Sequence, residues 1–126
     1  MLAFEMPKGA RYERHVRLLF AGVFVLTCGV HLVAIVHPAA SEASSPLRHA
    51  FFAGVNGAFA ALFARGVRWV VLPLVPLCLQ QGYSHGTDLV LASRRGEVDV
   101  QSALVLVFLP LALAYAWRLR SPRPAA

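Results

Sequence analysis

Apolar residues gather in four long stretches that are separated by short polar segments. The first stretch, at about residues 16–37, holds 19 residues from Leu18 to Val36 without any Asp, Glu, Lys or Arg. A helix needs about 20 apolar residues to cross the hydrocarbon core of a bilayer. This stretch therefore predicts a transmembrane helix by itself, and the stretches at about 46–64 and 100–119 predict two more.

The remaining apolar stretch is less regular. Its strictly apolar part begins near Val67 and ends at Leu79, which is too short to cross a bilayer alone. We predict that this helix continues through the polar string QQGYSHGTDLVLA to about Ala92, with its polar part facing protein. The third span then covers about residues 67–92. Pro73 and Pro76 predict a kink within it, as Pro110 does within the last span.

The segments between the stretches carry signals for helix ends. Ser45 followed by Pro46 is typical of an N-cap with proline at the first helical position. The RGVR sequence from Arg65 to Arg68 predicts a tight turn, and Asp99 can cap the last span. Residues 120–126 are expected to form a disordered tail.

The composition supports lipid as the solvent of the apolar residues. Hydrophobic residues make up 58% of the chain, charged residues make up only 14%, and the mean hydropathy is +0.62. Soluble domains carry roughly 25% charged residues, and a small domain needs polar residues to cover its large surface in water. The sequence therefore predicts an all-α transmembrane four-helix bundle, a single integral membrane domain over residues 1–126 with the lipid bilayer around it.

The cations are distributed unevenly about these spans. The net charge is +6, and nine of the 12 Lys and Arg residues lie in the N-terminal segment, the 65–68 turn and the C-terminal segment. The other three are Arg48, Arg94 and Arg95. Since cytoplasmic segments of membrane proteins carry the Lys and Arg excess, both termini are predicted to be cytoplasmic in a plasma or inner membrane. The cations flank apolar spans, so no nucleic acid is expected as a partner.

Counting residues along the spans predicts a polar layer near the outer face. A helix rises about 1.5 Å per residue, so equal counts from the inner boundary reach equal depth. About 15 residues outward, the count reaches the neighbourhood of His31, His49, Gln81 and Gln101, one in each span. The four spans thus place polar side chains at nearly one level.

The third span repeats this polar pattern along one helical face. Gln81, Ser84, His85 and Asp88 follow the spacing i, i+3, i+4, i+7, which is one stripe. Asp88 is then within reach of Ser84 and His85 along the helix. A carboxylate beside an imidazole can fix the tautomer of the ring, so this stripe is a candidate for chemistry.

Three kinds of ligand fit such a layer. Imidazoles from several helices can ligate a metal, two facing histidines can hold a haem iron, and His and Gln side chains can bind a quinone in an apolar pocket. The candidate ligand-binding residues are His31, His49, Asn56, Gln81, Ser84, His85, Asp88 and Gln101, and the candidate metal ligands are His31, His49, His85 and Cys28. A purely interfacial role for the histidines stays open, because helix ends near headgroups are polar in any case. No motif assigns a catalytic residue or a reaction.

Two further function classes remain open. Small residues in the second span recur at four-residue spacing, a small-xxx-small pattern that allows close helix packing; they are Ala53, Gly57 and Ala61, and also Gly54 and Ala58. This face can serve a homo-oligomer or an accessory subunit of a larger membrane complex. A small transporter component is the third class, since proline-broken helices are typical of transporters. The architecture resembles small four-span proteins such as quinone-linked disulfide oxidoreductases, but their paired cysteines in an outer loop are missing here.

Overall fold

The computed structural model describes residues 8–37 and 45–120, and all regular structure in these residues is helical. The chain divides into two compact units, Met1–Val67 and Arg68–Ala126, and each unit contains a helical hairpin. The all-α prediction is confirmed. Whether the two hairpins form one four-helix domain stays a prediction, and the expected tail at 121–126 lies outside the described residues.

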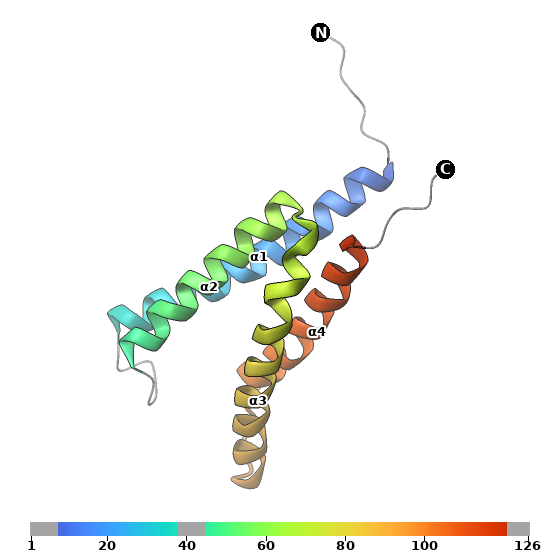
Figure 1. Ribbon diagram of the computed structural model, residues 1–126. Helices are drawn as coiled ribbons and strands as arrows, with labels where there is room; N and C mark the ends of the chain where they lie inside the picture. The colour runs from blue at the N-terminus through green and yellow to red at the C-terminus, as the bar shows by residue number, and fades with distance from the viewer. Residues whose placement is uncertain (1–7, 38–44, 121–126) are drawn as a thin grey trace. The chain divides into compact units, whose positions relative to one another are not determined.

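The first hairpin consists of α1 (Lys8–Val36) and α2 (Pro46–Arg65), which run side by side (Figure 1). α1 begins eight residues before the predicted span at 16, because the intervening residues are mostly compatible with a helix without being apolar. Its 29 residues give a length of about 44 Å, against a hydrocarbon core of about 30 Å. α1 is therefore longer than a bilayer requires.

Stacked phenylalanines form the core of this hairpin. Phe24 of α1 is only 1% exposed, and its ring lies 5.4 Å from Phe59 and 5.5 Å from Phe63 of α2, centroid to centroid. Phe20 stacks on Phe63 at 5.5 Å. Each such aromatic pair contributes about 0.5–1.5 kcal/mol beyond area burial. The hairpin is thus held by specific packing as well as by apolar contact.

The small residues of α2 divide between two faces. Ala53 is buried, and the space beside Gly57 is bounded by Cys28 of α1, whose Sγ lies 4.0 Å from where a Cβ on Gly57 would be. Gly54 and Ala58 are exposed, and a Cβ on Gly54 would meet nothing within 4 Å. One stripe of small residues therefore packs within the hairpin, while the other stays open.

Both predicted ends of α2 are confirmed. The Ser45 hydroxyl accepts the backbone N–H of Arg48 at 3.3 Å, and Pro46 occupies the first turn. At the other end Gly66 adopts φ 67°, a left-handed conformation that glycine reaches without steric cost. The N–H of Val67 then donates to the carbonyl of Leu62 at 3.1 Å, which closes the helix.

The guanidinium of Arg17 lies against this turn. A Cβ on Gly66 would collide with the Arg17 side chain, so the α1 cation reaches the carboxyl end of α2. A cation at this position is favourable, because the carboxyl end of a helix carries partial negative charge. Position 66 thus requires glycine for two reasons, its positive φ and the Arg17 side chain that fills the space of a Cβ.

The second hairpin consists of the short helix η2 (Arg68–Val70), α3 (Val71–Arg94) and α4 (Val100–Arg120). α3 runs without interruption through Pro76 and the polar string QQGYSHG, as predicted. Pro73 lies in its first turn, where a missing N–H costs nothing. The core of this hairpin includes Val70, Val71, Leu74, Ala92, Ser102, Leu109, Ala112 and Ala116.

A five-residue segment joins α3 to α4. Gly96 adopts φ 72°, and the N–H of Glu97 donates to the carbonyl of Ala92 at 3.0 Å, which terminates α3. Asp99 then accepts the backbone N–H of Ser102 at 2.9 Å. This bond confirms Asp99 as the cap of α4.

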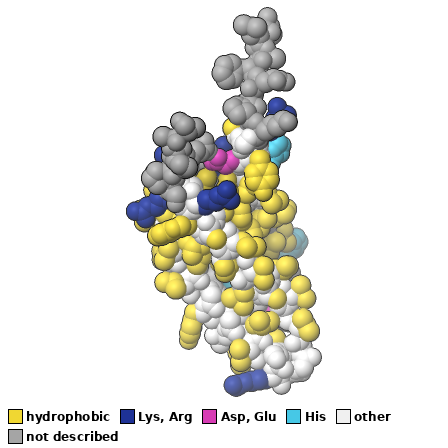
Figure 2. Space-filling model, turned by 90° about the vertical axis from the view of Figure 1, so that its right-hand side faces the viewer, with side chains coloured by type: hydrophobic (Ala, Val, Ile, Leu, Met, Phe, Trp, Pro, Cys, Tyr) yellow, Lys and Arg dark blue, Asp and Glu magenta, His cyan; other side chains and the backbone are white. Residues whose placement is uncertain are grey.

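Three of the described helices are long and apolar enough to cross a membrane, namely Gly9–Val36, Pro46–Arg65 and Val100–Arg120. Large apolar side chains point outward on them, with Leu26 71% exposed and Val107 63% exposed. Figure 2 shows hydrophobic side chains over much of the visible surface. Exposed apolar surface of this extent indicates a membrane protein. α3 has the length but not the composition, because its second half is polar.

Candidate functional site

The polar residues singled out by the sequence form two clusters, one in each hairpin. The first, termed the histidine pair, consists of His31 in α1 and His49 in α2, with 3.1 Å between their Nδ1 atoms. Their ring centroids are 5.4 Å apart and the rings are tilted by 42°. Depth counting placed these two residues at one level, and the packing of α1 on α2 brings them into contact.

Proton counting constrains the tautomers of the histidine pair. Two facing Nδ1 atoms at hydrogen-bond distance share one proton, so one ring donates and the other accepts. Among the described residues, the buried Nε2 of His49 has no hydrogen-bond partner. A buried N–H without a partner is rarer than an unused acceptor, which favours His49 with its proton on Nδ1. Its Nε2 then carries a lone pair.

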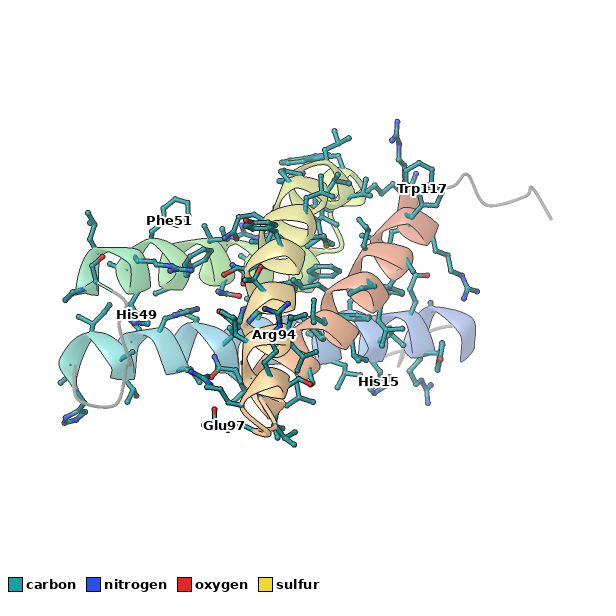
Figure 3. The ribbon with its side chains drawn as sticks, turned by 90° about the horizontal axis from the view of Figure 1, so that it is seen from below. His15, His49, Phe51, Arg94, Glu97 and Trp117 are labelled. Atoms are coloured by element: carbon teal, nitrogen blue, oxygen red, sulfur yellow. The ribbon has the colours of Figure 1, made fainter. Side chains whose placement is uncertain are left out.

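An aromatic ring and a cation adjoin the pair. Phe52 stacks on His31 with centroids 5.6 Å apart, and the guanidinium carbon of Arg48 lies 6.0 Å from the Phe52 centroid. Figure 3 shows His49 between α2 and α1, whereas Phe51 points away from α1. The faces of α2 thus differ, and the one toward α1 carries the imidazole.

Asn56 and Cys28 lie in the same hairpin, further from the segment that joins α1 to α2. Asn56 is 8% exposed, and its amide donates to the carbonyl of Phe52 at 2.7 Å, one turn back on its own helix. Cys28 is a free cysteine beside Gly57. Neither contact links these residues to the histidine pair, so their predicted roles as ligands stay predictions.

The second cluster, termed the Asp99–Ser102–His85 chain, connects α3 to the start of α4. The Oγ of Ser102 lies 2.9 Å from Nδ1 of His85 and donates its proton to Oδ2 of Asp99 at 2.5 Å. Ser102 is 2% exposed, so water is kept from its hydroxyl. The hydroxyl and the backbone N–H of Ser102 both bond to Asp99, and they hold the pKa of that carboxyl below its usual range.

The other predicted residues of the second hairpin have separate surroundings. The amide of Gln81 donates to Gln80 at 2.8 Å. Ser84 is half-buried, whereas Asp88 and Gln101 are exposed. Of the predicted stripe, His85 is thus the residue with a described bond to α4.

The sequence predicted Asp99 only as a cap, and the depth count reached Ser102 but named its neighbour Gln101 as the candidate. The spacing of Asp99 and Ser102 was an available signal, because an N-cap side chain bonds to the third residue of its helix. The contact of Ser102 with His85 had no such signal. It depends on how α4 is rotated against α3, which residue spacing does not give.

In the part of the chain that the structure describes, no group of three or more His, Cys, Asp or Glu side chains is arranged to hold a metal ion. The candidates His31, His49, His85 and Cys28 therefore do not meet as one protein-only cage. Comparisons with protein-family models, curated proteins and solved structures found no match.

Proposed function

We propose that this chain is a multi-pass membrane protein that binds a transition metal ion through the histidine pair. The first element of the proposal is the topology. In the first hairpin the free helix ends carry Arg11, Arg14, Arg17 and Arg65, against Arg48 at the loop end. In the second hairpin Arg68, Arg118 and Arg120 lie at the free ends, against Arg94 and Arg95. The positive-inside rule then favours four crossings with both termini cytoplasmic.

The distance within the histidine pair carries the metal proposal. Two metal–nitrogen bonds of about 2.0–2.1 Å at tetrahedral or right angles place their nitrogens roughly 2.9–3.4 Å apart. The 3.1 Å between the Nδ1 atoms of His31 and His49 falls in this range. Axial ligands on opposite sides of a haem iron would stand about 4 Å apart, by the same bond length. The pair therefore fits adjacent coordination positions on Zn²⁺, Cu²⁺ or Co²⁺ better than haem ligation.

Two protein ligands leave coordination positions open. Water or a small molecule completes such a site, so the bound metal exchanges readily and can present a ligand. Binding through both Nδ1 atoms requires the donor ring of the pair to change tautomer: its Nδ1 proton passes to solvent and its Nε2 takes one up, so both rings stay neutral. Binding is expected to weaken at low pH, because a metal-ligating imidazole must be neutral.

Titration of the purified protein in detergent with Co²⁺ tests the proposal, since cobalt reports its coordination by visible absorption. His31→Ala and His49→Ala are expected to abolish the spectrum. His37→Ala is the matched control, because His37 is an exposed histidine just beyond the end of α1. A wild-type protein without a cobalt spectrum would refute the proposal. Quinone binding that depends on the same two histidines would replace the metal by a hydrogen-bonded ligand.

The open stripe of α2 supports a second candidate, an accessory subunit of a membrane complex. Gly54 and Ala58 are exposed and leave room for the backbone of another transmembrane helix. Gly54→Leu should then release a partner in mild detergent while cobalt binding persists. Gly22→Leu, at an exposed glycine of α1 with the same open surroundings, serves as the control.

A further inference from the structure

The Asp99–Ser102–His85 chain fixes where the proton of the imidazole lies. Ser102 has one hydroxyl proton, and it goes to Oδ2 of Asp99. The 2.9 Å contact between Ser102 Oγ and His85 Nδ1 therefore needs the ring as its donor. A neutral His85 then carries its proton on Nδ1 and its lone pair on Nε2.

We propose that this chain is a proton-transfer path between the imidazole of His85 in α3 and water at the α3–α4 turn. A proton from water or a protic ligand binds to Nε2 of His85. The Nδ1 proton passes to Ser102 Oγ as the hydroxyl proton passes to Oδ2 of Asp99, and the carboxylic acid releases it to water. One proton enters and one leaves, so the charge of the chain is unchanged, and the reverse passage, in which Nε2 loses its proton and Asp99 takes one from water, restores the Nδ1 tautomer of His85.

Burial and charge suit the three groups to these roles. Ser102 is almost completely buried, so bulk water does not bypass it. Asp99 lies in the turn, where water can take its proton, and its lowered pKa favours release of that proton to water. The other charged groups near this end are Asp88, Arg94 and the Arg95–Glu97 ion pair at 3.1 Å. They are exposed and screened by solvent.

Helix capping alone does not account for this arrangement. A cap needs only the bond from the backbone N–H of Ser102 to Oδ1 of Asp99, at 2.9 Å. The second carboxylate oxygen, the hydroxyl and the imidazole form an additional series of bonds. This series leads from the aqueous end of α4 to the side chain of another helix, and it does not involve the histidine pair.

Nuclear magnetic resonance of ¹⁵N-histidine-labelled protein in detergent tests the path. The wild type is expected to show His85 protonated on Nδ1, with that proton exchanging rapidly with solvent. Ser102→Ala and Asp99→Asn are each expected to slow this exchange by about 100-fold, the lower end of the usual effect of a positioned proton-transfer group. Ser102→Thr keeps a hydroxyl and should restore the rate.

The variants separate transfer from folding. Asn is as good an N-cap residue as Asp, so Asp99→Asn should keep α4 folded. This variant therefore still tests the path if Ser102→Ala proves to be unfolded. Gln101→Ala, at the exposed neighbour of Ser102, should leave the exchange rate unchanged. Wild-type His85 protonated on Nε2, an unchanged rate in Asp99→Asn, or equal slowing in Gln101→Ala would each overturn the proposal.

Discussion

A lysine at Val107 tests whether lipid surrounds α4. Val107 is 63% exposed and lies seven residues after Val100 and ten before Trp117, so it is well inside the helix from either end. The matched control is Val98→Lys. Val98 is 82% exposed and lies in the turn before α4. Both changes thus convert an exposed valine into lysine, and they differ in their depth in the proposed bilayer.

The expected effect of the two changes differs by about 3 kcal/mol. At the centre of a transmembrane helix, valine changes the free energy of insertion by about −0.3 to −0.6 kcal/mol, which favours insertion. Lysine changes it by about +2.5 to +3.5 kcal/mol, which opposes insertion. Since every 1.4 kcal/mol is a factor of about ten, Val107→Lys should lower the ratio of inserted to non-inserted α4 roughly 100-fold. In water both substitutions would change stability by less than about 0.5 kcal/mol.

Reporter fusions to the C-terminus measure this ratio. One reporter is active only in the cytoplasm and the other only outside. Each is fused in a separate protein after residue 126. In the proposed topology, failure of α4 to insert leaves the C-terminus outside, so Val107→Lys should shift activity to the outer reporter while Val98→Lys does not. Equal behaviour of the two lysine variants would refute the assignment of α4 to the bilayer.

The packing and capping of the hairpins give three more predictions. Phe24→Ala should destabilise the first hairpin by at least about 1–3 kcal/mol, the contribution of two stacked pairs, in unfolding followed by circular dichroism. Gly66→Ala should lower the free energy of unfolding by roughly 1–2 kcal/mol because of its positive φ, and by more because the new Cβ would collide with Arg17. Gly54→Ala should stabilise α2, because a Cβ at position 54 would meet nothing within 4 Å. The lowered pKa of Asp99 stabilises the second hairpin above the unfolded pKa of about 3.9, and this contribution is lost as pH falls through the lower folded value. Melting should therefore occur earlier in acid for the wild type, and Asp99→Asn should lose most of this pH dependence.

Local signals predicted the helix ends well, because each depends on a few neighbouring residues. Ser45, Gly66 and Asp99 act through bonds within one turn, and these bonds are present. The continuation of α3 through its polar half was also predicted, since a helical stripe needs no partner to be recognised. The early start of α1 was missed, because hydropathy marks the apolar stretch and not the helix that contains it.

The site was predicted only in part, because residue counting gives depth and not direction. Gln101 and Ser102 lie at the same level but differ by about 100° around the helix. The count reached Ser102 and the prediction chose Gln101 beside it, but Gln101 is exposed, while Ser102 is buried and bonds to His85. His31 and His49 meet because they lie at the same level and also point toward each other. Residue counting gives the level, but only the packing of α1 on α2 gives the direction.

In the proposed four-span topology, the polar second half of α3 has a consequence for biosynthesis. A nascent segment with so many polar side chains would partition poorly from the translocon into lipid when it emerges alone. Only five residues separate it from α4, so the ribosome delivers the more apolar segment almost immediately afterwards. The two segments would then leave the translocon as a pair, with the hydroxyl and imidazole groups already shielded from acyl chains. Premature termination before residue 100 should therefore leave a nascent chain that quality-control proteases remove.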